Sequence, residues 1–134
     1  MNSKAVSFPL LVEVSPGELI DRACILRIKA SRLKEDTARL NALSQAECMR
    51  EALASILQAS AEVQELAQQL DQINMSLWDA ENAIRVAEHE QHFGEAFVET
   101  ARRICHLNDH RSHVKREINM LLQSSVYEVK EYDR

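Results

Sequence analysis

The fold is decided by the stretch Ser15-Pro16-Gly17-Glu18-Leu19-Ile20-Asp21-Arg22-Ala23-Cys24-Ile25-Leu26-Arg27-Ile28-Lys29. Ser15 is a good helix N-cap, and Pro16 falls at the first helical position, where its missing N–H costs nothing. Glu18 follows Ser15 by three residues, which completes a capping box at the positive end of the helix dipole. The stretch therefore predicts a helix that begins at Pro16 and runs to about Lys34.

This helix carries both an apolar seam and a stripe of charge. The seam recurs at steps of three and four, through Leu19, Ala23, Leu26, Ala30 and Leu33. Other apolar residues lie outside the seam, so we expect the helix to be enclosed around most of its circumference. The stripe consists of Glu18, Arg22, Lys29 and Arg32. It is either a solvated edge with a Glu18–Arg22 pair or one wall of a polar site.

The composition indicates one helical domain, because 134 residues contain only two glycines and two prolines. A net charge of −5 argues against a general nucleic-acid binder, which needs a basic face. No apolar run is long enough for a membrane span, and the N-terminus lacks the pattern of a signal peptide. Three widely spaced cysteines indicate unpaired thiols in a reducing compartment. We therefore expect a cytoplasmic protein.

The rest of the chain predicts an all-α antiparallel bundle of three to four long helices with short extended termini. Residues 1–14 are expected to be an extended lead-in, 15–123 the helical bundle, and 124–134 a tail whose residues 126–129 could form a short strand with residues 10–14. The second helix begins either at Asp36 or at Ser44, and a further break is predicted at residues 58–60. The last hairpin turns at Phe93–Gly94, where we expect Gly94 to end a helix with a positive φ.

Polar residues stand among the core positions of the last helix, namely Asn108, Arg111, Lys115 and Asn119. The preceding helix has a matching edge of Asn74, Trp78, Glu81 and Arg85 beside its leucine seam. Counting outward from the hairpin brings Glu81 opposite Arg111 and Lys115, so we expect a direct or one-water contact there. Together with the charged stripe, these residues hold more cations than anions, which suits an anionic ligand. The alternative is a self-satisfied network that fixes the register of the helices.

No metal site or cofactor is predicted. His106, His110, His113 and Glu117 share one stripe, but that stripe lies opposite the core side of the last helix. The chain also has no Gly-rich phosphate loop and no G-x-S-x-G or HExxH motif.

Three motifs resemble a bacterial domain-of-unknown-function family of small helical proteins. They are Ser15 to Lys29, the central Leu77-Trp78-Asp79-Ala80-Glu81-Asn82-Ala83-Ile84-Arg85, and Asn108-Asp109-His110-Arg111 followed by Lys115, Ile118, Asn119 and Leu121. The resemblance implies that the polar residues of these motifs belong together: Glu18, Asp21, Trp78, Glu81, Arg85, Asn108, Asp109, Arg111, Lys115 and Asn119. Relatives often carry Asp-Pro at the position of Asp36-Thr37, which favours a helix boundary there. The resemblance also implies a link to surface-polysaccharide biosynthesis, and it assigns no reaction.

Two functions remain open from the sequence. The first is a non-enzymatic accessory module that binds a protein partner, with a homo-oligomer among its forms. The second is a small-molecule-binding domain or a small enzyme with an interhelical pocket for an anionic metabolite. The candidate binding residues are the same for both, namely Glu18, Asp21, Arg22, Lys29, Trp78, Glu81, Arg85, Asn108, Asp109, Arg111, Lys115 and Asn119.

Overall fold

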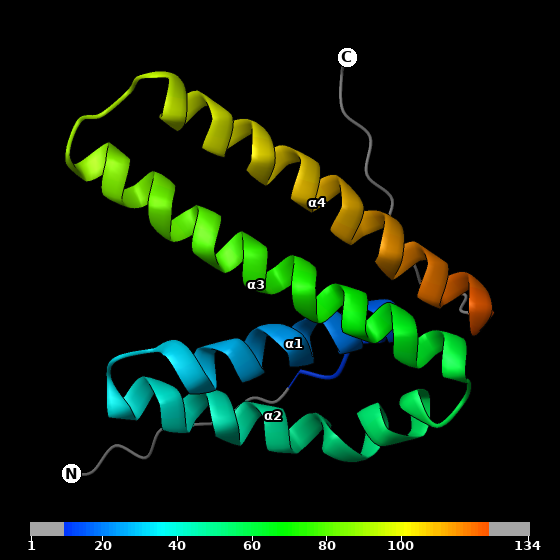
Figure 1. Cartoon of the computed structure of the whole chain (residues 1–134). Helices are drawn as coiled ribbons and strands as arrows, with labels where there is room; N and C mark the ends of the chain where they lie inside the picture. The colour runs from blue at the N-terminus through cyan, green and yellow to red at the C-terminus, as the bar shows by residue number, and fades with distance from the viewer. Residues whose placement is uncertain (1–9, 124–134) are drawn as a thin grey trace, which may run out of the picture.

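The computed structural model describes residues 10–123, and this range folds into four helices. They are α1 (Pro16–Arg32), α2 (Asp36–Leu57), α3 (Ala61–His89) and α4 (Glu95–Leu121). Figure 1 shows two antiparallel hairpins, α1–α2 and α3–α4, packed against each other near the N-terminal end of α1. The predicted all-α bundle is therefore confirmed, and no strand occurs within the described range.

The starts of α1 and α3 follow the capping signals. The Ser15 side chain accepts a hydrogen bond from the Glu18 backbone N–H at 3.1 Å, and Ser60 caps α3 in the same way through Val63 at 3.1 Å. Of the two predicted starts for the second helix, Asp36 is correct. Ser44 lies inside α2. A capping sequence does not start a new helix where the apolar periodicity continues on both sides of it.

The turn between α3 and α4 corrects the prediction for Gly94. This glycine has φ of −78° and is the N-cap of α4, whereas the positive φ of 59° belongs to Gln91. Two hydrogen bonds form there, from the His92 N–H to the Ala87 carbonyl at 2.8 Å and from the Gln91 N–H to the Glu88 carbonyl at 3.1 Å. This pattern is a Schellman motif, so α3 ends at His89, five residues before the glycine that we expected to end it.

The core lies between α1, α3 and α4. Its fully buried residues are Ile20 and Cys24 of α1, Val63, Leu66, Ala67, Leu70, Ile73 and Leu77 of α3, and Val114 and Ile118 of α4. Helix α2 covers this core through Leu53, Ile56 and Leu57, and it buries only Ala42 completely. The position of α1 against both other helices is thus what creates the core.

Beyond this core, α3 and α4 continue as a two-helix extension, here termed the distal arm (residues 81–113). No residue of the distal arm is fully buried. The rings of Phe93 and Phe97 meet edge to face at its tip, with centroids 5.4 Å apart. The distal arm therefore depends mainly on contacts between α3 and α4, while Arg111 at its base bonds to α1.

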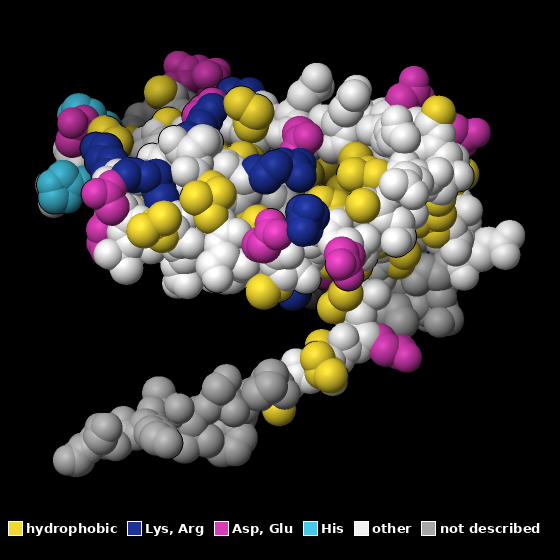
Figure 2. All heavy atoms as spheres, turned by 90° about the horizontal axis from the view of Figure 1, so that it is seen from below, with side chains coloured by type: hydrophobic (Ala, Val, Ile, Leu, Met, Phe, Trp, Pro, Cys, Tyr) yellow, Lys and Arg dark blue, Asp and Glu magenta, His cyan; other side chains and the backbone are white. Residues whose placement is uncertain are grey.

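Residues 10–14 form neither helix nor strand, and the side chain of Leu11 is 95% exposed. Figure 2 shows this apolar segment standing clear of the helices. The strand predicted for residues 126–129 lies outside the described residues. Within residues 10–123, none of the helices combines the length and the apolar character that crossing a membrane requires.

Candidate functional site

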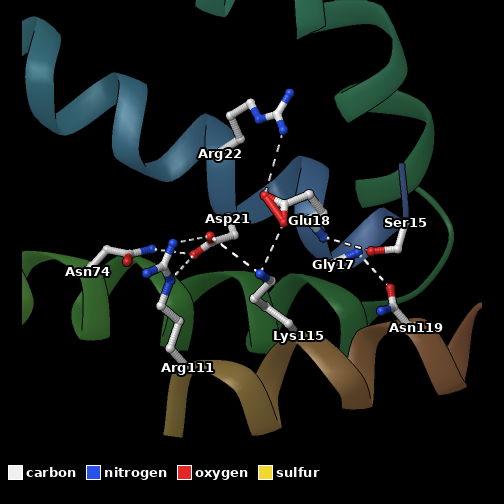
Figure 3. Close-up of polar contacts among 9 residues, drawn as sticks. All are labelled: Ser15, Gly17, Glu18, Asp21, Arg22, Asn74, Arg111, Lys115 and Asn119. Carbon is white, nitrogen blue, oxygen red and sulfur yellow. Dashed lines mark hydrogen bonds and ion pairs between the residues drawn. The ribbon is translucent and has the colours of Figure 1, made fainter. Parts of the chain in front are cut away.

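A buried carboxylate, Asp21 of α1, joins three helices. Its side chain is 1% exposed and accepts hydrogen bonds from Asn74 of α3 at 2.9 Å and from Arg111 of α4 at 2.8 and 2.5 Å. The two bonds from Arg111 use Nε and one terminal nitrogen, so the pair is bidentate. Figure 3 shows Asn74, Arg111 and Lys115 directed toward Asp21 from the neighbouring helices. A carboxylate buried in this way is tolerated only because it is paired.

Lys115 of α4 extends this network to the first turn of α1. Its Nζ lies 3.1 Å from Glu18 Oε2 and 3.9 Å from Asp21 Oδ2, and its side chain is nearly buried. Glu18 also lies 3.9 Å from Arg22 at the exposed edge. The expected Glu18–Arg22 pair therefore exists, but the buried Lys115 is the closer partner of Glu18.

The start of α1 also docks directly on the backbone of α4. The Gly17 N–H donates to Asn119 Oδ1 at 2.8 Å, which satisfies one of the unpaired amides of a helix N-terminus. A Cβ at residue 17 would lie 2.5 Å from the carbonyl oxygen of Lys115. Only glycine allows this approach, so Gly17 and Asn119 fix the place where α1 meets α4.

A groove of about 420 Å³ opens beside this network. Its lining comes from three helices: Ile25 of α1; Asn74, Leu77, Trp78, Glu81, Asn82 and Arg85 of α3; and Asn108 and Arg111 of α4. Trp78 is half-buried and is the single tryptophan of the chain. Asn74 and Arg111 belong to both the groove and the network, so the Asp21 contacts hold two of the groove's side chains in place.

Within residues 10–123, the predicted direct contact of Glu81 with Arg111 or Lys115 does not form. Glu81 pairs with Arg85 of the same helix at 3.9 Å, while Arg111 and Lys115 bond to carboxylates of α1. Counting from the hairpin placed α3 against α4 correctly, because Glu81 and Arg111 line the same groove. The count could not place α1, whose buried Asp21 offers Arg111 a bidentate partner that the half-exposed Glu81 does not.

The candidate residues divide into two groups that touch. The network contains Glu18, Asp21, Arg111, Lys115 and Asn119, and the groove contains Trp78, Glu81, Arg85, Asn108 and Arg111. Arg22 lies at the rim of the network, whereas Lys29 and Asp109 are exposed and line neither feature.

The predicted list of binding residues left out Gly17, Asn82 and Asn74, although Asn74 stood on the predicted polar edge of the third helix. Asn74 precedes Trp78 by one helical turn, and this position on the same stripe was the signal for it. Gly17 carried a signal too, because a glycine in the first turn of a well-capped helix needs a packing reason.

Two further ion pairs tie α1 to α3. Arg27 lies 2.6 Å from Asp71, and Arg32 lies 2.7 Å from Asp79. Both pairs are partly exposed, so each is worth at most about 1 kcal/mol. These pairs help to fix the register of α1 against α3, and they form no binding site.

The groove offers binding groups more than reactive ones. Its described lining includes amides, guanidinium groups, an indole and one carboxylate, but no Ser, Cys, His or Lys. A general acid–base pair would need a second titratable group of suitable pKa in reach of Glu81. The lining can therefore bind a molecule by hydrogen bonds, charge and apolar contact.

A search of curated proteins and a search of solved structures each found no match. Residues 10–134 match the model of a family described as a family of unknown function, DUF6165. This match spans the whole of the four-helix fold, including the network and the groove. The chain therefore belongs to the DUF6165 family.

Proposed function

We propose that this protein is a non-enzymatic binding module that takes a small polar molecule in the groove beside Trp78. The carrying observation is a groove of about 420 Å³ built from three helices around the only tryptophan. Small-molecule sites have volumes of this order and combine an apolar floor with a few convergent polar groups. Here Ile25, Leu77 and Trp78 are the apolar part of the lining, and amides and charged groups from α3 and α4 are its polar part.

The groove is also preorganised. Arg111 is held by two hydrogen bonds to Asp21, and Asn74 by one. Side chains fixed before binding lose little conformational entropy when a ligand arrives, which favours affinity. The network thus holds side chains of the groove in place, although most of the network itself is buried.

The experiment is a thermal-shift screen of the full chain against metabolites, including anionic ones, with Trp78 fluorescence as the second readout. A ligand at about 100 times its Kd stabilises the fold by about 2.7 kcal/mol. Glu81→Gln should abolish this shift and leave the unliganded stability nearly unchanged, because Glu81 is half-exposed and only loosely paired. Glu88→Gln is the matched control, since Glu88 is exposed on the same helix and lies outside the groove. Equal ligand shifts in both variants would refute the proposal.

A second candidate function is an accessory module for a protein partner or a second copy. The observation that favours it is the distal arm, which has no fully buried residue and exposes Val86, Phe93 and Val98. Such a module would act in the cytoplasm beside enzymes of surface-polysaccharide synthesis, the setting that the family resemblance implies. Sedimentation of the purified chain tests self-association, and a monomer at all concentrations would leave only a different protein as partner.

A further inference from the structure

We infer that the ligand of the Trp78 groove is an uncharged, polyhydroxylated molecule of the sugar type; this rests on the proposed binding function of the groove. The first argument is charge. The lining carries Glu81, Arg85 and Arg111, and the charge of Arg111 is met by the buried Asp21. One anion and one cation remain, so the groove has no net charge to offer an anionic ligand.

Most cations in the wider surroundings of the groove also have a carboxylate partner. The sequence assembled six cations here, and five of them lie within ion-pair distance of a carboxylate: Arg22, Arg32, Arg85, Arg111 and Lys115. The sixth, Lys29, is exposed and lies outside the groove. A phosphate or a dicarboxylate is bound by cations whose charge is not already neutralised. Six cations face four carboxylates, Glu18, Asp21, Asp79 and Glu81, so the cation excess that predicted an anionic ligand is reduced, and five of the six cations already have a carboxylate partner.

The second argument is hydrogen-bond chemistry. The amides of Asn82 and Asn108 each carry both a donor and an acceptor group, Glu81 is an acceptor, and Arg85 is a donor. A hydroxyl group can act as donor and acceptor at once, so hydroxyls match every polar group of this lining. A carboxylate or phosphate is acceptor-only and would leave Glu81 and the amide oxygens facing a like charge.

The third argument is the apolar side of the groove. Ile25, Leu77 and Trp78 are the apolar residues of the lining, and they can hydrogen-bond to a ligand only through the indole N–H. A sugar ring presents C–H groups on its faces and hydroxyls at its edge, which fits an apolar floor with a polar rim. Together the three arguments select a neutral sugar over a simple anion or a purely apolar molecule.

The test is a titration of the full chain with neutral methyl glycosides and disaccharides. The fluorescence emission of Trp78 is the readout. Glucuronate and glucose 6-phosphate serve as anionic counterparts with the same ring, and citrate and inorganic phosphate as anions without a ring. We expect a saturable emission change with at least one neutral sugar, an affinity that added salt does not weaken, and no gain from the anionic group. Asn108→Ala should weaken binding about tenfold or more, since it removes a polar contact, whereas Asn41→Ala, on the exposed side of α2, should not change it.

The outcomes separate the two proposals. Tighter binding of the anionic sugars or of citrate, with loss at high salt, would overturn the neutral-ligand inference and leave the groove as a binding site. Emission changes that survive equally in Asn108→Ala would show that the sugars bind elsewhere and would also overturn the inference. If no compound of either class, in the sugar panel or the metabolite screen, changes the emission or the thermal midpoint, the proposed function itself fails.

Discussion

Asp21 is the residue on which the contacts between helices depend most. Removing its carboxylate in Asp21→Ala leaves Arg111 and Lys115 beside each other without their shared buried anion. We expect a loss of about 3–5 kcal/mol in the free energy of unfolding, the usual result of breaking a buried pair from one side. Asp36→Ala is the control, because Asp36 is 84% exposed and pairs with Arg39 at the surface, where about 1 kcal/mol or less is expected. Urea denaturation measures both, and equal losses would contradict the role given to Asp21.

Gly17 gives a prediction based on space rather than on backbone conformation, since no glycine of the described chain has a positive φ. The added methyl of Gly17→Ala would meet the Lys115 carbonyl at 2.5 Å and Asn119 Oδ1 at 3.0 Å, so α1 must move away from α4. We expect a loss of about 1–3 kcal/mol, as in other overpacked contacts. Gly94→Ser should be neutral or should stabilise the fold by a few tenths of a kcal/mol. Nothing lies near a Cβ placed at residue 94, and serine is the better N-cap. Chemical denaturation decides, and a harmless Gly17→Ala would mean that this contact is looser than the structure has it.

Cys24 gives a prediction about pH. Burial raises the pKa of its thiol, and a hydrogen bond and the charge of Asp71 add to this shift. The folded protein therefore keeps the proton, whereas the unfolded chain releases it near the ordinary thiol pKa of about 8.5. The contribution of the Cys24 thiol to the free energy of unfolding is complete below that pH and is lost as the pH rises above it. The stability advantage of wild type over Cys24→Ala should narrow at alkaline pH, while exposed Cys48→Ala should show no such trend. Unfolding curves at several pH values test this, and a constant difference would contradict it.

At the scale of elements, the end of α3 has a residue whose replacement by glycine should stabilise the fold. Gln91 adopts φ of 59°, a left-handed conformation that costs a side-chain-bearing residue about 1 kcal/mol. Gln91→Gly keeps the Schellman hydrogen bonds and removes this cost, so we expect a stabilisation of about 1 kcal/mol. Thermal unfolding provides the measurement, with Gln68→Gly in the middle of α3 as the control that should lose stability. Destabilisation in both variants would show that Gln91 has contacts that outweigh its strain.

The helices themselves were largely predictable, because their signals are local. Ser15, Ser60 and Asp36 mark helix starts in the sequence and begin helices in the structure. The end of α3 was not predictable from Gly94, since a Schellman motif formed at Gln91 instead and left the glycine to begin the next helix. Turn chemistry of this kind depends on how the two helices approach each other, which the spacing of residues does not contain.

At the scale of the whole molecule, the sequence predicted which residues gather at the site but not which ion pairs they form. Counting from one hairpin relates α3 to α4, and it brought Trp78, Glu81, Asn108 and Arg111 together as the groove does. The partners of Arg111 and Lys115 come from α1 and lie 90 and 97 residues away in the sequence. No local pattern encodes the rotation of α1 against that hairpin. The choice between Glu81 and Asp21 as counter-ion therefore required the three-dimensional structure.

The same arrangement predicts where the molecule opens first. Residues 63–80 and 114–119 pack against α1 around the core, whereas the distal arm from 81 to 113 has no fully buried residue. Local stability follows the burial of apolar contacts, so amides of the distal arm should exchange with solvent at a lower free energy than amides of the core. Hydrogen exchange followed by mass spectrometry resolves the two regions as separate peptides.

A ligand sharpens this prediction, because the groove lies where the distal arm leaves the core. Trp78, Glu81 and Arg85 line it from α3, and Asn108 and Arg111 from α4, while the turn around Phe93 is distant from it in both helices. A bound ligand should therefore slow exchange in residues 78–85 and 108–111 and leave residues 88–100 unchanged. A protein partner on the distal arm should instead protect residues 88–100. Uniform protection of the arm and the core without any ligand would contradict the description of the arm as the least stable part of the fold.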